Sequence, residues 1–227
     1  GDPAALVERS LAALGGIERF VKAGNDVIIK PNICVAYHSY EYAATTNPWV
    51  VGALVRLCLG AGAGRVRVMD FPFGGEAGQA YAVSGIEEQV AANGGEMETM
   101  SPFKYMKTSL PNASALKETE IYDDILKADV LINVPIAKHH NLARLTLGMK
   151  NLMGTVLHRE ILHWQLGQSL ADLAGFLRPA LTIVDAVRIL KDHGPSGGRL
   201  EDVQQMDTLV ASPDILAADV WSASLFG

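Results

Sequence analysis

Residues 130–135 read Val-Leu-Ile-Asn-Val-Pro, and this stretch decides the fold class. A short apolar run that is rich in β-branched residues and closed by proline is typical of a strand covered on both faces. Shorter apolar runs of the same kind occur at residues 27–30, 66–70 and 181–185, and segments with helical spacing separate them. We therefore predict an α/β fold, with a mostly parallel sheet and helices on both faces.

The helices between these strands carry recognisable end signals. Asn47 and Pro48 suit the N-cap and first position of a helix that runs to about Leu59, where a glycine-rich turn ends it. Residues 121–126 are predicted to form a short helix. The chain has 227 residues, of which 49% are hydrophobic, and this is enough for one sizeable core. We expect a single α/β domain over residues 1–227.

Composition excludes several classes of partner and cofactor. The net charge of −6 argues against nucleic-acid binding, and no apolar run approaches the ~20 residues of a membrane helix. Cys34 and Cys58 are too few for a disulfide framework, and an iron–sulfur cluster is possible only if chains share it. Cys58 is expected in the core. A homodimer is plausible, and the location is cytoplasmic by default, or exported if a signal precedes this sequence.

Polar side chains at the ends of the predicted strands are the first candidates for ligand binding. In a parallel sheet, ligands bind beyond the carboxyl ends of the strands. Thr46 and Asn47 lead into a helix N-terminus, which suits anion binding, although capping alone explains them equally well. Asp70 could orient a ligand or a histidine. The candidate binding residues are Lys30, Asn32, Thr46, Asn47, Asn151 and Asp185.

The segment 138–163, directly after the central strand, is basic in an otherwise acidic protein. It carries lysine, arginine and histidine side chains, and its single acid is Glu160. A basic pocket in an acidic protein indicates a small anionic ligand. Three of its residues, Lys138, His140 and Lys150, are the catalytic candidates. His140 and His163, with Cys34, are the candidate metal ligands, for nickel, iron or zinc.

Lys150 stands among Leu, Met and Gly residues, where desolvation lowers a lysine pKa and makes the amine a better nucleophile or base. The alternative is a lysine that reaches solvent from an ordinary helix. If residues 140–150 formed one straight helix, His140 and Lys150 would not share a face. Gly148 is a plausible break that would bring them together.

Five blocks of sequence resemble the signatures of one family, the domain-of-unknown-function family three-six-two. They are Ile28–Asn32, Ala44–Pro48, Lys150–Gly154, Ile183–Ala186 and Gly194–Pro195. Many members of that family are described as iron–sulfur-binding. The segment 138–163 also resembles, more distantly, the N-terminal domain of nickel-pincer lactate racemases. That resemblance implies that Lys150 matches a cofactor-holding lysine, His163 a nickel ligand and His140 an acid/base histidine.

Our leading hypothesis from the sequence is a metal-dependent or redox-associated enzyme domain. It would bind a small anionic substrate or nucleotide-like cofactor at the carboxyl edge of the sheet. One alternative is a non-catalytic iron–sulfur accessory domain whose cluster is shared between subunits, with Cys34 as one ligand. A second alternative is a metabolite-binding domain without turnover.

Overall fold

The structure is a computed structural model that describes residues 2–227, so Gly1 of the predicted span lies outside the described residues. The main sheet contains β1 (Asp26–Pro31), β2 (Arg65–Val68), β3 (Glu96–Met97), β6 (Val130–Val134), β7 (Ile136–His140), β8 (Arg144–Thr146), β9 (Leu181–Leu190) and β10 (Val203–Ser212). A separate two-stranded sheet contains β4 (Tyr105–Ser109) and β5 (Glu118–Tyr122). The helices are α1 (Pro3–Ala13), α2 (Pro48–Gly60), α3 (Ala77–Ser84), α4 (Ile86–Ala92), α5 (Asp123–Lys127), α6 (Gly148–Asn151), α7 (Leu166–Leu177) and α8 (Ile215–Ala223).

The main sheet is mostly parallel, which confirms the predicted fold class. Its strand order is β3-β2-β1-β6-β9-β7-β8, and β10 pairs with β9 along most of that strand. Among the described strands of this sheet, only β8 and β10 run antiparallel to their neighbours. The parallel strands therefore bring their carboxyl ends to one edge of the sheet, where the predicted site residues lie.

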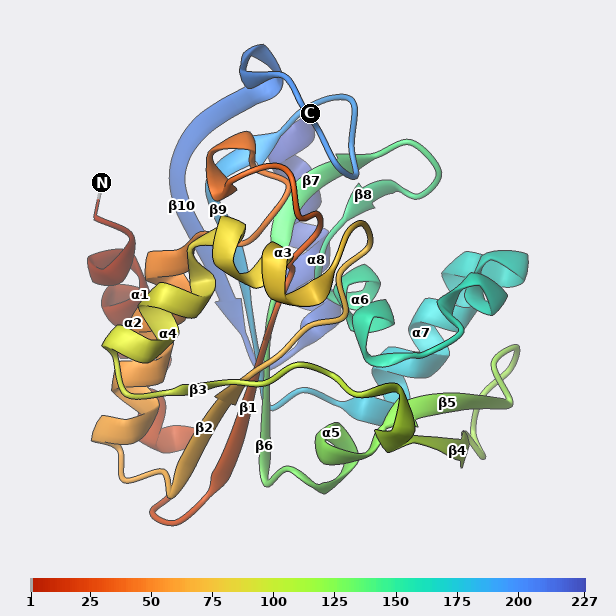
Figure 1. The fold of residues 1–227 in the computed structure, drawn as a ribbon, viewed down its shortest axis with the longest axis horizontal. Coiled ribbons are helices and arrows are strands. Elements are labelled where there is room, and N and C mark those ends of the chain that lie inside the picture. The colour runs from red at the N-terminus through yellow and green to blue at the C-terminus, as the bar shows by residue number, and fades with distance from the viewer. Residues whose placement is uncertain (1) are drawn as a thin grey trace.

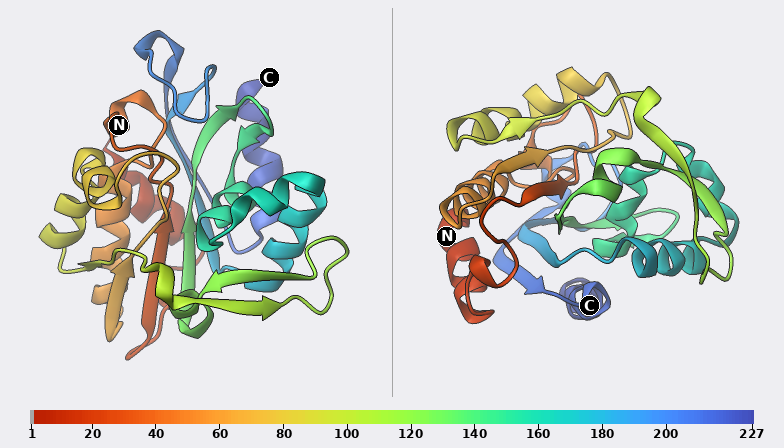
Figure 2. Two further views of the ribbon diagram at one scale, coloured as in Figure 1. Left: turned by 45° about the vertical axis from the view of Figure 1, so that its right-hand side comes forward. Right: turned by 90° about the horizontal axis from the view of Figure 1, so that it is seen from below.

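Helices cover both faces of this sheet (Figure 1). On one face α1, α2 and α4 pack over the largest apolar core, to which β1, β2, β6 and β9 contribute. On the other face lie α6, α7 and α8, and Figure 2 shows α8 on the same side as α7. The β4–β5 hairpin and α5 cover the rest of that face through Tyr105, Tyr122 and Ile125.

The predicted central strand is longer than its apolar run indicates. β6 ends at Val134, Pro135 follows, and the chain continues at once as β7. Pro135 has no amide hydrogen to donate, but its carbonyl accepts a hydrogen bond from the Asp185 amide at 2.8 Å. β6 and β7 thus pair with successive halves of β9. Lys138 and His140 therefore lie within a strand, not after one.

One local prediction is wrong. Residues 121–126 are not one helix: β5 continues to Tyr122, and helix α5 starts only at Asp123. The straight helix over residues 140–150 that would separate His140 from Lys150 does not form, because β7 turns into β8 and helix α6 begins at Gly148. By contrast, the helix start at Asn47 is confirmed, since its side chain accepts a hydrogen bond from the Trp49 amide at 3.0 Å. Within residues 2–227, no helix has the length and apolar character needed to cross a bilayer.

Candidate functional site

One cavity of about 800 Å³ opens at the carboxyl edge of the sheet, beyond the ends of β1 and β2 and beside β7. The segments after β1 and β2, strand β7, helix α6 and the 3-10 helix Arg159–Gln165 build its wall. Seven of the residues selected from the sequence line it, namely Asn32, Cys34, Lys138, His140, Lys150, Asn151 and His163. The catalytic candidates Lys138, His140 and Lys150 therefore line one cavity. Strand β7 and the turn into β8 bring His140 near Lys150, which a helix broken at Gly148 was expected to do.

A buried ion pair supports one side of the cavity. Lys30 Nζ lies 2.6 Å from an Asp70 carboxylate oxygen, and both side chains are almost wholly buried. The other Asp70 oxygen accepts a hydrogen bond from the Ile33 amide at 2.7 Å. Burial lowers the pKa of Lys30 and the charge of Asp70 opposes that effect. Lys30 is absent from the cavity wall, so we interpret the pair as a support for the neighbouring site residues.

Three asparagine side chains connect helix α6 to the strand ends. Asn151 Oδ1 accepts hydrogen bonds from Lys30 Nζ at 3.2 Å and from Asn32 Nδ2 at 3.0 Å. Its Nδ2 donates to Asn133 Oδ1 at 2.9 Å. Because Asn151 directly follows Lys150, these bonds fix the position of the helix that carries the candidate lysine. Asn151 is a predicted ligand-binding residue, and its contacts show that it also has a structural role.

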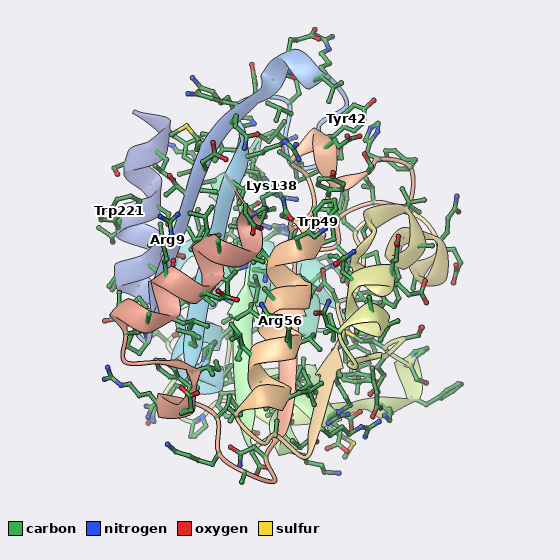
Figure 3. All side chains as sticks on the ribbon, turned by 90° about the vertical axis from the view of Figure 1, so that its left-hand side faces the viewer. Arg9, Tyr42, Trp49, Arg56, Lys138 and Trp221 are labelled. Atoms are coloured by element: carbon green, nitrogen blue, oxygen red, sulfur yellow. The ribbon has the colours of Figure 1, made fainter. Side chains whose placement is uncertain are left out.

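Lys138 carries a buried charge without a buried counter-charge. The residue is 1% exposed, and its Nζ donates to Asn32 Oδ1 at 2.8 Å and to the Ala44 carbonyl at 2.6 Å. Within residues 2–227, no carboxylate forms an ion pair with it at 4.0 Å or less. A buried cation is costly unless it is paired. Figure 3 shows Lys138 inside the molecule, whereas Arg56 on α2 and Trp221 on α8 lie at its surface.

Lys150 is a second cation in the same cavity. The hydrogen bond of its Nζ is to the Met153 sulfur at 3.3 Å. Burial, together with the positive charges of Lys138 and Arg159, lowers the pKa of Lys150 to about 8. The lowered pKa agrees with the predicted desolvation, and the residue is only partly buried.

His140 is held as a neutral imidazole with a defined tautomer. Its Nδ1 accepts hydrogen bonds from the backbone amides of Leu142 at 3.1 Å and Ala143 at 3.3 Å. Backbone amides can only donate, so Nδ1 is unprotonated and the ring proton sits on Nε2. Burial, together with the positive charges of Lys150 and Lys138, lowers the pKa of His140 to about 4. His140 is therefore a hydrogen-bond donor near neutral pH.

The expected metal ligands do not combine into a metal site. His140, His163 and Cys34 all line the cavity, but in the described part of the chain no three His, Cys, Asp or Glu side chains gather closely enough to hold a metal ion. His140 would have to lose its Nε2 proton to bind a metal through that atom. Cys34 donates its thiol to the Pro195 carbonyl at 3.5 Å. These residues do not fit a protein-held divalent metal.

Cys58 lies in the main core, as predicted, and burial raises the pKa of its thiol to about 12. Both cysteines are free and buried. No second cysteine therefore accompanies Cys34 at the cavity, and a cluster shared between chains stays a prediction.

Asp185, Asn47 and Thr46 are buried beside the cavity and do not line it. The Asp185 carboxylate accepts hydrogen bonds from the amides of Asn47 at 2.7 Å and Val187 at 2.9 Å. Burial raises the pKa of Asp185 to about 6. Thr46 Oγ1 accepts from the Asn32 amide and donates to the Val134 carbonyl, each at 2.8 Å. These contacts hold the segment after β1 against β6 and β9, and so position Asn32.

Arg159 was not selected from the sequence, although it lines the cavity. Its guanidinium donates to the carbonyls of Phe71 at 2.9 Å and Pro72 at 2.8 Å, and it lies 4.9 Å from the centre of the Phe71 ring. The sequence offered no specific signal for it, because its anchors are backbone carbonyls of a distant loop. With Lys138 and Lys150 it makes the cavity strongly cationic, since the acidic side chains on the wall are Asp70, which is paired, and Glu160 at the surface.

Comparison with known proteins places the chain in a family. The profile described as "Domain of unknown function (DUF362)" matches residues 27–224, and the chain belongs to this family. The sequence blocks that resembled the family therefore indicated it correctly.

Among individual relatives, a thylakoid-associated protein of Synechocystis is 28% identical over 96% of this chain and 68% of its own length.

Solved structures show the same fold at low sequence identity. The lactate racemase apoprotein from Thermoanaerobacterium thermosaccharolyticum superposes with a TM-score of 0.57 at 12% identity, over 99% of this chain and 55% of that protein. A structural-genomics protein from Thermotoga maritima gives a TM-score of 0.51 at 10% identity, over 100% of this chain and 60% of that protein. The chain thus spans little more than half the length of these two proteins. At such identities the likeness describes the fold alone.

Proposed function

We propose that this chain is an enzyme domain that binds a small organic anion in the cavity at the carboxyl edge of the sheet. The observation that carries the proposal is Lys138, a fully buried ammonium with two neutral oxygen partners and no carboxylate within ion-pair distance in residues 2–227. A bound carboxylate or phosphate would supply the missing counter-charge. Arg159 and Lys150 add positive charge on the same wall.

The shape and lining of the cavity also suit an organic ligand. About 800 Å³ lies in the range of small-molecule sites, ~300–1,000 Å³. Ile33, Phe71, Phe73 and Met153 supply apolar wall beside the cations. Such a wall favours a ligand with an apolar part over a fully hydrated inorganic ion.

Two further groups favour turnover over simple storage of a ligand. The Lys150 amine is partly deprotonated near neutral pH, and the neutral His140 imidazole carries a proton on Nε2. A base or nucleophile and a hydrogen-bond donor beside an anion site are the elements of acid/base or covalent catalysis. No step of this proposal passes through a metal, because the available ligands do not fit one.

Thermal denaturation with a panel of anions tests the binding. We expect acetate, benzoate, succinate or inorganic phosphate to raise the melting temperature, and a ligand at 100 times its Kd to add ~2.7 kcal/mol of stability. Lys138→Met should abolish the shift. Lys127→Met, which removes an exposed lysine on α5, is the matched control and should keep it. Equal shifts in both variants, or no shift with any anion, would refute the proposal.

A further inference from the structure

The environment of Lys150 differs from that of the other lysines in the interior. Lys30 is paired with Asp70, and two oxygen atoms hold the Lys138 ammonium. Lys150 has only a thioether sulfur as its hydrogen-bond partner, and none of the ion pairs within residues 2–227 includes it. Of these three lysines, Lys150 is therefore the one whose ammonium loses the least hydrogen bonding when it gives up a proton.

The backbone around Lys150 is anchored on both sides. The Asp219 carboxylate of α8 accepts hydrogen bonds from the amides of Gly148 at 2.6 Å and Met149 at 2.9 Å. On the other side, Asn151 bonds to Asn133 and to Lys30. The helix of only four residues thus has its first turn fixed by side chains from three other elements. Such anchoring positions the lysine before any ligand arrives.

We propose that Lys150 forms an imine with an aldehyde or ketone that also carries a carboxylate or phosphate group. The anionic group would lie against Lys138 and Arg159, and the carbonyl carbon would face the Lys150 nitrogen. This inference rests on the proposed anion site for the choice of substrate, but not for the reactivity of the amine.

The chemistry balances without a further reactant. The neutral Lys150 amine attacks the carbonyl carbon, and one C–N bond forms to give a carbinolamine. The C–O bond then breaks, and the oxygen leaves as water with the two protons of the amine. The Nε2–H of His140 is available to donate a hydrogen bond to that oxygen as it gains negative charge. Nothing is oxidised or reduced.

The state of the amine agrees with this assignment. With a pKa of about 8, about a tenth of Lys150 is neutral at pH 7, whereas an ordinary lysine near 10.4 is neutral at well below ~0.1%. Burial is the main cause, and the charges of Lys138 and Arg159 add to it. An anion bound between Lys138 and Arg159 would partly neutralise their charges and raise the pKa of Lys150 again. The fraction of neutral Lys150 amine is therefore larger in the free protein than in the anion complex.

Trapping with sodium borohydride tests the inference, because reduction turns an imine into a stable secondary amine. The protein is treated with glyoxylate, with glyceraldehyde 3-phosphate or with acetaldehyde, then reduced and analysed by intact mass and peptide mapping. We expect one adduct, on the peptide that contains Lys150, with a yield that rises with pH around a midpoint near 8. Glyoxylate and glyceraldehyde 3-phosphate separate a carboxylate site from a phosphate site.

Variants distinguish failure of the imine from failure of the anion site. Lys150→Arg should lose the adduct and keep the charge, and Lys138→Gln should reduce trapping of the anionic carbonyls at least tenfold while acetaldehyde still labels Lys150. If anions bind but wild-type Lys150 is labelled no faster than surface lysines, the imine is refuted and the anion site stands. If acetaldehyde labels Lys150 as well as the anionic carbonyls do, the amine is reactive and the anion site fails.

Discussion

Gly154 offers a sharp test of the buried ion pair that supports the cavity. A Cβ atom at this position would collide with an Asp70 carboxylate oxygen and would lie 2.8 Å from Lys30 Nζ. Gly154 does not have a positive φ, so alanine suits its backbone and the effect is steric and electrostatic. Gly154→Ala should therefore push Lys30 and Asp70 apart.

The size of the effect follows from the burial of the pair. Breaking a buried ion pair by removing one partner costs ~3–5 kcal/mol, and a methyl group that merely separates the partners costs less. Overpacking alone costs ~1–3 kcal/mol, and the Gly-to-Ala change returns ~0.4–1 kcal/mol through the unfolded chain. We expect a net loss of about 2–4 kcal/mol in the free energy of unfolding.

Urea denaturation followed by circular dichroism measures this loss. Gly175→Ala is the matched control, because Gly175 lies within α7 and a Cβ there meets nothing within 4 Å. The control should gain ~0.5–1 kcal/mol, since alanine is the better helix former. If Gly154→Ala is as stable as the control, the Lys30–Asp70 pair is not packed against residue 154 and the reasoning about this support is wrong.

Three other expectations concern charged or ionisable groups around the cavity. Asp219→Ala should lower the free energy of unfolding by about 2 kcal/mol and weaken anion binding, because it leaves the first amides of α6 without their acceptor. An unchanged midpoint in urea denaturation would contradict this role. In NMR titrations His140 should stay neutral from pH 5 to 8, with its midpoint at about 4, and a His140 midpoint near 6.5 would disprove its burial. For Asp185, the folded pKa of about 6 lies above the ordinary 3.8, so its contribution to stability is present below pH ~4 and is lost as pH rises through 6. This loss amounts to about 3 kcal/mol, and the pH profile of Asp185→Asn should lack it.

The parts of the fold that sequence alone predicted are those with one dominant signal. β6 was found because its run is apolar and rich in β-branched residues, and α2 because Asn47 and Pro48 mark its start. β7 was missed because Lys138 and His140 look like solvent-exposed residues. Their burial depends on partners from distant segments, Asn32 and Ala44 for Lys138, and no local pattern reveals such partners.

The candidate site shows the same division between local and distant information. The charge pattern of 138–163 led to Lys138, His140 and Lys150, which do share a cavity. The charge pattern does not reveal that two backbone amides donate to Nδ1 of His140. The metal hypothesis required a free lone pair on Nδ1 or on Nε2 of this ring. Asp185 was expected at the ligand, but its hydrogen bonds go to backbone amides beside the cavity.

The anchoring of α6 by Asp219 has a consequence for how the protein matures in the cell. The cavity is supported by Lys30 near one end of this sequence and by α8 near the other. While a ribosome is still making the chain, β1, β2 and β6 can already pair, but the Lys150 helix has no acceptor for its first amides until α8 has emerged. A nascent chain stalled before residue 215 should therefore show a protected sheet in hydrogen exchange and no competent cavity.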